Sequence, residues 1–313
     1  MLEPKKNGND IRIEGILSEV DLETRNFKDK RTGADRRAIS GTIKIRVDQK
    51  LRKTDTELTT LEIPVSVFAS ELKNDGAPNP AYENLTKLTT EYTSIAASDL
   101  AHADRVRITS GQLRMNEYYN QAGKLISFPR ISTAFISKVK PEDFKPSATF
   151  STIFVVANKG YELDNEGVET DKYCITGVVP QWGGKVDVVK FYTASQNVTD
   201  AVSQYWEQGD TVSAAGKLNF SSTTETTLKE VDFGDPVEET RTISVSELLI
   251  TSGQAAALEG EFAYDQDEIT AALAERKSDL AKKKEEAANR NASTGKKGSA
   301  PASKVSQFND LGF

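Results

Sequence analysis

The 313-residue chain has few of the side chains that catalytic and metal sites use most often. It contains one histidine, His102, and one cysteine, Cys174. No zinc site with several His or Cys ligands can therefore form, no disulfide can close within the chain, and a reducing compartment is favoured. The sequence also lacks a Walker loop and a dinucleotide-binding fingerprint. We expect no enzyme, no cofactor and no metal, and we expect His102 at the surface or at a helix end.

Long apolar segments are also missing. No stretch approaches the roughly 18 residues that a membrane span needs, and residues 1–6 lack the apolar region of a signal peptide. Hydrophobic residues make up 37% of the chain and charged residues 28%, which is typical of small β domains with an appended polar segment. We therefore expect a cytoplasmic protein that does not associate with a membrane.

The net charge of −7 is distributed unevenly along the chain. Residues 1–140 hold 23 Lys and Arg against 19 Asp and Glu, a net charge of +4, whereas residues 141–260 hold 8 against 19, a net charge of −11. Residues 261–313 hold 9 of each sign and are neutral. Such an asymmetry indicates that the two halves have different roles.

Apolar and polar residues alternate in several short segments of the first half. This period of two predicts half-buried strands over 11–17, 43–47, 61–67, 105–108 and 131–139. A helix is predicted between the third and fourth strands, with Asn79 as its cap and Pro80 in its first turn. Its apolar stripe is Tyr82, Leu85, Leu88, Tyr92 and Ile95. Three strands, a helix and two strands is the element order of the OB-fold, a five-stranded Greek-key barrel.

The second half repeats this order, which supports the same fold for both halves. Predicted strands cover 150–158, 173–179, 186–192, 211–220 and 242–250. The helix between them covers 197–208, with Val198, Val202, Tyr205 and Trp206 on one stripe. Locally, Gly111-Gln112-Leu113 matches Gly216-Lys217-Leu218, and each glycine is expected at a kink where its barrel closes.

The predicted fold class is mainly β, with two OB-fold-like five-stranded barrels in tandem. The first, basic domain covers residues 10–140 and the second, acidic domain covers 147–253. A linker and a solvated helix with little apolar face follow over 254–288. Residues 289–313 are rich in Ala, Ser, Gly, Asn and Lys, so they cannot offset their ordering entropy by burial and are expected to be disordered.

Two segments of the first domain combine cations with aromatic rings, the two features with which proteins hold single strands. The connection between its first two strands offers Arg25, Phe27, Lys28, Lys30, Arg31, Arg36 and Arg37. Its last hairpin offers Arg114, Tyr118, Tyr119, Lys124, Phe128 and Arg130. Both segments are too polar to be core, so we interpret them as loops that bind a polynucleotide. Because Tyr118 and Tyr119 are adjacent, an extended segment would direct only one of them at a base.

Strand parity adds four cations to this candidate interface. If Ile43, Ile45 and Val47 face the barrel interior, Lys44 and Arg46 must face outward, because side chains alternate along a strand. By the same argument, Arg105 and Arg107 face outward beside Val106 and Ile108. Each of these cations could equally belong to an ordinary solvated barrel surface.

The second domain offers fewer candidates. Its last connection, residues 221–239, is long and acidic, and would repel phosphate. Trp182, at a hairpin tip with Gly183 and Gly184, and Tyr192, at a strand end, are its candidate stacking residues. Covering the barrel end or a domain interface is an equally good interpretation of both rings. This domain is therefore expected to bind strands weakly or to contact other proteins.

The segment Phe308-Asn309-Asp310-Leu311-Gly312-Phe313 resembles the C-terminal partner-binding tip of bacterial single-stranded-DNA-binding proteins. That tip places acidic residues before an aliphatic residue, Pro and a final Phe; here one Asp replaces the acidic run and Gly312 replaces Pro. With the tandem barrels, the chain is similar to single-stranded-DNA-binding proteins of bacteriophages or mobile elements. The resemblance implies sequence-tolerant coating of single-stranded DNA, with RNA left open, in the cytoplasm of a bacterial host. It also implies that Phe308, Asp310, Leu311 and Phe313 recruit replication or recombination proteins.

Other classes of function remain compatible with the sequence. The barrels could belong to a structural or assembly β-protein that acts through protein contacts, or to a recombination mediator that anneals strands. A nuclease with an acidic metal site would have to use residues such as Asp164, Glu166, Glu169 and Asp171. A monomer and a homodimer are both compatible with two barrels in one chain.

Overall fold

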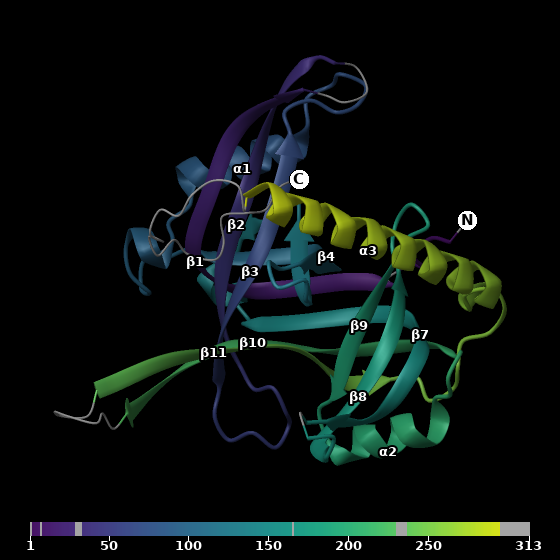
Figure 1. The fold of residues 1–313 in the computed structure, drawn as a ribbon. Coiled ribbons are helices and arrows are strands. Elements are labelled where there is room, and N and C mark those ends of the chain that lie inside the picture. The colour runs from purple at the N-terminus through teal and green to yellow at the C-terminus, as the bar shows by residue number, and fades with distance from the viewer. Residues whose placement is uncertain (1, 7, 29–32, 165, 230–236, 295–313) are drawn as a thin grey trace.

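The computed structural model describes residues 2–6, 8–28, 33–164, 166–229 and 237–294. It is mainly β, and its strands form one continuous sheet that closes into two five-stranded barrels (Figure 1). This confirms the predicted fold class. None of the helices in these ranges is long and apolar enough to cross a membrane.

The first barrel contains five strands and one helix of at least three turns. Its elements are β1 (Asn9–Lys28), β2 (Asp35–Gln49), β3 (Thr59–Ser70), α1 (Pro80–Glu91), β4 (Arg105–Tyr119) and β5 (Leu125–Thr133). The pairing runs β1–β2–β3–β5–β4 and returns to β1, and only β3 and β5 are parallel. This is the closed Greek-key order of the OB-fold. The short elements η1 (Ile95–Ala97), β6 (Ser137–Lys138) and η2 (Pro141–Asp143) complete this half.

The second barrel repeats the first element by element. It consists of β7 (Ser147–Leu163), β8 (Glu169–Pro180), β9 (Val186–Thr193), α2 (Gln196–Tyr205), β10 (Thr211–Lys229) and β11 (Val237–Gly253). The pairing runs β7–β8–β9–β11–β10 and returns to β7, with β9 and β11 parallel. β7 to β11 are therefore equivalent to β1 to β5.

The barrel interiors follow the predicted alternation. Ile43, Ile45 and Val47 are fully buried. Asn79 caps α1 as predicted, because its side-chain oxygen accepts a hydrogen bond from the Ala81 N–H at 3.1 Å. In α2 the predicted stripe is wrong at Tyr205, which is 49% exposed. The polar Thr199 takes a place in the buried face, where its hydroxyl is bonded to that of Thr193 at 2.6 Å.

The predicted kink at Gly216 is confirmed. The register of β10 against β11 shifts between Ala215 and Gly216. A Cβ at Gly216 would lie 2.0 Å from the Leu249 carbonyl oxygen and 2.7 Å from the Phe150 ring. Only glycine allows the strand to approach its neighbours this closely.

Three segments that the sequence predicts as loops are paired strands instead. β1 and β2 pair out to Lys28 and Asp35, β4 and β5 out to Tyr119 and Leu125, and β10 and β11 out to Lys229 and Val237. These hairpins extend beyond the barrels, as Figure 1 shows for β10 and β11. Strands that project from a core have no buried face, so their sequences lose the period of two that marks a strand.

The barrels are joined through their first strands. Asn9–Glu14 of β1 pair antiparallel with Thr152–Ser147 of β7. Within the same stretch, β1 pairs on its other edge with β4, and β7 pairs on its other edge with β10. Both strands exchange partners further along: β1 pairs with β2 from Ile16 onward, and β7 pairs with β8 from Val155 onward.

Amide side chains, two of them buried, strengthen this seam. Gln49 of β2 donates to the Ala148 and Leu218 carbonyls at 3.2 Å each, and its Oε1 accepts from the Ala148 N–H at 2.9 Å. Asn9 of β1 bonds both the N–H and the carbonyl of Leu113, at 2.9 and 2.7 Å. Gln181, in the turn between β8 and β9, donates to the same carbonyl at 3.2 Å.

Glu14 supplies a charge to the seam. Burial alone would raise the pKa of the Glu14 carboxyl, but hydrogen bonds from Arg107 at 2.6 Å and from the Lys145 N–H at 2.5 Å hold that pKa below its usual value. The same hydrogen bond raises the pKa of Arg107. The ion pair thus links β1 and β4 to the chain segment that leads into β7.

Helix α3 (Gln266–Thr294) lies across both barrels (Figure 1). Most of its surface is exposed, as predicted, but Ile269 and Ala272 are buried in a second small core with Val155, Val178 and Tyr264. Further along the helix, Arg276 forms an ion pair with Glu117 of β4. Lys283 donates to the Glu117 carbonyl at 3.1 Å. The helix therefore connects the second barrel to the β4–β5 hairpin of the first.

We expect Gln49→Leu to destabilise the protein, because the substitution leaves the Ala148 N–H and two carbonyls of the seam without their partner. Each buried polar group that loses its hydrogen bond costs about 1–3 kcal/mol. Urea unfolding should show a free energy of unfolding lower by at least that amount. Gln208→Leu, at an exposed position after α2, is the matched control. Equal stability of the two variants would contradict this role of Gln49.

Candidate nucleic-acid interface

Two arginines face each other on the outer surface of the first barrel. Arg114 of β4 pairs directly with Arg130 of β5, and β5 is bordered on its other edge by β3. The side chains surround a shallow hollow of about 260 Å³. Its lining includes Ser66, Phe68, Arg114, Asn116, Arg130 and Ser132. We call this surface the β3–β5–β4 face.

Arg130 is held in place by its neighbours. Its Nε donates to the Ser66 hydroxyl on β3 at 2.7 Å. Burial lowers the pKa of Arg130, the opposite of the shift that Glu14 produces in Arg107. A guanidinium that is partly desolvated before any ligand arrives gives up less hydration when an anion binds, so its attraction for a phosphate is stronger than at an open surface.

Aromatic rings lie at both ends of the β3–β5–β4 face. Asn116 is opposite Phe128, and Tyr118 follows two residues later on the same side of β4. The rings of Tyr118 and Phe128 meet edge to face, with centroids 6.3 Å apart, and are 46% and 39% exposed. Because β4 is extended here, Tyr119 points to the opposite side and is half-buried, so only Tyr118 belongs to this face.

Phe68, at the far end of β3, is the residue that the sequence analysis missed. It is 52% exposed, and its ring lies 6.4 Å from that of Phe27 on the β1–β2 hairpin. Phe68 thereby lies between the β1–β2 hairpin and the hollow beside Arg114 and Arg130, and so links the two segments that the sequence predicts to bind a polynucleotide. Parity could have identified it, because Leu61, Ile63, Val65 and Val67 face inward and Phe68 is out of phase with them.

The acidic residue of the β4 hairpin is directed away from the face. Glu117 lies between Asn116 and Tyr118 and therefore points to the other side of β4, where it is paired with Arg276 of α3. Its side chain is 8% exposed. Strand alternation thus keeps this carboxylate off the face, and the ion pair with Arg276 of α3 balances its negative charge.

The four cations predicted from strand parity do face outward, but none of them lines the hollow of the β3–β5–β4 face, and each has a local partner. Lys44 is paired with Glu19 at 2.5 Å, Arg46 with Asp48 at 3.4 Å and Arg107 with Glu14 at 2.6 Å. Arg105 lies over the Phe144 ring, 5.5 Å from its centroid. Three of the partners are acids, so these cations attract phosphate less than the sequence analysis assumed.

The β1–β2 hairpin carries a mixed set of cations. Arg25 is paired with Glu23 at 2.6 Å, and Arg36 donates to the carbonyls of Leu72 and Lys73 at 3.4 and 3.1 Å. Lys28 and Arg37 are exposed. Lys124 is exposed in the β4–β5 turn, where its N–H donates to the Asn120 side chain at 2.9 Å. Lys30 and Arg31 lie outside the described residues, as do Phe308, Asp310, Leu311 and Phe313.

The structure does not bring the two aromatic candidates of the second barrel together. Trp182 lies in the turn before β9 and is 55% exposed, beside Gln181, which bonds to β4 of the first barrel. Tyr192 is near the other end of β9, and its hydroxyl donates to Glu162 at 3.0 Å. Burial, and then the charge of Glu162, raise the pKa of Tyr192.

His102 lies at the surface, and the described acidic residues form no candidate metal site. The His102 side chain is 76% exposed and bonds to Asp99 at 2.9 Å, at the surface position that was predicted. Among the described residues, no group of three or more His, Cys, Asp or Glu side chains could hold a metal ion.

Comparison with known proteins gives one family match and several distant structures. A family model described as YorF matches residues 7–286. No curated protein matches the sequence. The crystal structure of wild-type single-stranded DNA binding protein from Thermus aquaticus is similar, with a TM-score of 0.46 and 8% identity over 80% of this chain and 94% of that chain.

Two further structures show weaker similarity. A deletion variant of the Thermus aquaticus protein has a TM-score of 0.43 and 7% identity, and the match covers 83% of this chain and 97% of that chain. A replication protein A heterotrimer bound to single-stranded DNA has a TM-score of 0.23 and 9% identity, over 90% of this chain and 54% of that chain.

Proposed function

We propose a function for this chain, which belongs to the YorF family: it binds single-stranded DNA along the β3–β5–β4 face of the first barrel, with little regard for base sequence. The observation that carries the proposal is the order of side chains on that face. Phe68 lies at one end, Arg114 and Arg130 lie opposite each other in the middle, and Phe128 and Tyr118 lie at the other end.

This order matches the chemistry of a single strand. Bases stack on aromatic rings through their π-faces, which every base has, and the phosphates between them pair with cations. In a duplex the base faces are covered by neighbouring base pairs, so the rings of Phe68, Phe128 and Tyr118 would find no partner. We therefore expect tight binding to single strands and poor binding to duplex DNA.

The two halves would divide the work. The basic first domain, residues 10–140, would hold the strand, and the acidic second domain, residues 147–253, would support it and contact other proteins. A protein of this kind protects strands during DNA replication or recombination. If the chain binds oligothymidine but also accelerates pairing of complementary strands, the annealing mediator becomes the better description.

Alanine substitution of the aromatic residues should weaken binding. Tyr118→Ala, Phe128→Ala and Phe68→Ala each remove a ring from the face, and a lost base stack costs about 1–3 kcal/mol. Fluorescence anisotropy of labelled oligothymidine measures the change. Tyr205→Ala, at a similarly exposed ring on α2, is the matched control and should bind like the wild type. If all four variants bind equally well, the strand does not pass over this face.

The two arginines should control the salt dependence. Each phosphate contact contributes about −0.7 to the slope of log affinity against log salt for a single strand. Arg114→Gln and Arg130→Gln should therefore each make the slope shallower by about that amount.

Arg12→Gln removes the same charge from an arginine that is 70% exposed and paired with Asp10 on β1, and it should leave the slope unchanged. Equal slopes in all three variants would contradict phosphate contacts at Arg114 and Arg130.

The segment 308–313 would serve partner recruitment rather than strand binding. In sequence, one acid, Asp310, is flanked by the apolar residues Phe308, Leu311 and Phe313. This composition suits a pocket on a replication or recombination protein. Removing residues 308–313 should leave oligothymidine affinity equal or slightly higher, because one carboxylate no longer competes with phosphate. Anisotropy titration of the truncated chain tests this, and a clear loss of affinity would refute the separation of roles.

A further inference from the structure

The second barrel has a face that is equivalent to the β3–β5–β4 face of the first. Because β9, β10 and β11 are equivalent to β3, β4 and β5, we call it the β9–β11–β10 face. The alignment of the two faces starts from the matching segments Gly111-Gln112-Leu113 of β4 and Gly216-Lys217-Leu218 of β10. Leu113 pairs with Ile131 of β5, and Leu218 pairs with Leu248 of β11. The next pairs are Arg114–Arg130 in the first barrel and Asn219–Glu247 in the second.

Two cations in one barrel are thus replaced by an amide and an acid in the other. Glu247 is the equivalent of Arg130, and its side chain is 15% exposed. The third strand of each barrel shows the same equivalence. In the first barrel Ser66 of β3 pairs with Ser132 of β5, and in the second Tyr192 of β9 pairs with Leu249 of β11. Tyr192 therefore takes the position of Ser66, whose hydroxyl bonds to Arg130. The second face therefore contains an aromatic ring, but a carboxylate where the first has a guanidinium.

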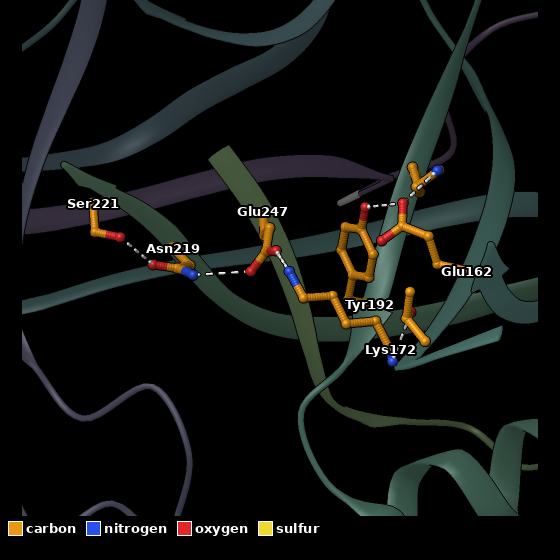
Figure 2. Close-up of polar contacts among 8 residues, drawn as sticks. Glu162, Lys172, Tyr192, Asn219, Ser221 and Glu247 are labelled. Atoms are coloured by element: carbon orange, nitrogen blue, oxygen red, sulfur yellow. Dashed lines mark hydrogen bonds and ion pairs between the residues drawn. The ribbon is translucent and has the colours of Figure 1, made fainter. Parts of the chain in front are cut away.

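Neighbouring side chains engage both oxygens of the Glu247 carboxylate (Figure 2). Lys172 of β8 donates to one at 2.6 Å, and Asn219 donates to the other at 3.0 Å. Asn219 in turn accepts from the Ser221 hydroxyl at 3.1 Å. The hydrogen bond to Glu247 raises the pKa of Lys172, so the ammonium stays charged and paired.

The ring of Tyr192 belongs to the same network. Figure 2 shows its hydroxyl bonded to Glu162. The Glu162 carboxylate also accepts a hydrogen bond from Lys190 at 2.9 Å. The Lys172 ammonium lies over the ring, 5.7 Å from its centroid. Lys172 and Lys190 are therefore both paired with acids, and the ring that a base would need is partly covered by Lys172.

We propose that Glu247 is a specificity-determining residue that excludes the polynucleotide from the β9–β11–β10 face and confines the strand to the first barrel. The inference rests on the proposed function. A phosphate that entered the second face as it enters the first would meet a fixed carboxylate, and the charge of Lys172 is already largely balanced by its short ion pair with Glu247. The second barrel therefore keeps the fold of a strand-binding barrel while rejecting the strand.

Glu247→Gln tests the proposal, since it removes the charge and keeps the shape. At low salt the variant should bind long oligothymidine on the order of fivefold more tightly, the effect of one like-charge contact relieved in water. Its salt slope should steepen by about 0.7 for each phosphate gained. The shortest oligothymidine that gives full affinity should also become longer, because the strand now extends onto a second face.

Two control variants separate this effect from general ones. Glu259→Gln makes the same charge change at an exposed position outside the barrels and should leave the site length unchanged. Lys172→Met breaks the same ion pair but keeps the carboxylate, so its affinity should not rise. If Lys172→Met gains affinity as much as Glu247→Gln does, loosening of the face explains the effect and the proposal is overturned.

A measurement on the wild-type chain keeps the proposal testable even if Glu247→Gln does not fold. Photocrosslinking to oligothymidine that carries a photoreactive base should label peptides of β3 and the β4–β5 hairpin, and none from β9 or β11. Labelling of β9 or β11 in the wild type would refute the role of Glu247. Absence of any oligothymidine binding would instead refute the proposed function itself.

Discussion

The antiparallel pairing of β1 with β7 is the constraint on which the rest of the molecule depends. Each strand is the first of its barrel. Its N-terminal part pairs with the other barrel on one edge and with its own barrel on the other, and its C-terminal part pairs only within its own barrel. Backbone hydrogen bonds in the seam must be satisfied in a fixed register. The seam therefore sets the position of the second barrel, and with it the positions of the β8–β9 turn and α3 against β4.

That arrangement decides the charge of the proposed binding face. α3 begins on the second barrel, where Ile269 and Ala272 are buried, and reaches β4 of the first, where Arg276 pairs with Glu117. The negative charge of Glu117, in the first barrel, is thus balanced by an arginine of the helix that follows the second barrel in the chain. The two barrels share one fold but differ in chemistry, because the equivalent strand pair is Arg114–Arg130 in one and Asn219–Glu247 in the other.

Much of the fold could be predicted, and so could part of the site. The buried alternation of Ile43, Ile45 and Val47, the Asn79 cap and the kink at Gly216 follow from local rules of strand, helix and bulge geometry. Tyr118, Phe128, Arg114 and Arg130 were recognised from composition, and the structure brings them onto one face. Phe68 was missed, because it belongs to a strand whose other residues indicate only core.

Local sequence patterns are enough to predict which strand residues face inward, where the helices begin, and that cations and aromatic rings occur together in two segments of the first half. These properties depend on neighbours within a few positions, because the pleat and the helical turn repeat over short distances. Which cations are already paired, and which hairpins continue as strands, depends on contacts between distant parts of the chain. Arg107 and Glu14 are 93 residues apart, and Arg276 and Glu117 are 159 apart. The first contact forms only once the first barrel has closed, and the second only once α3 has docked across the two barrels.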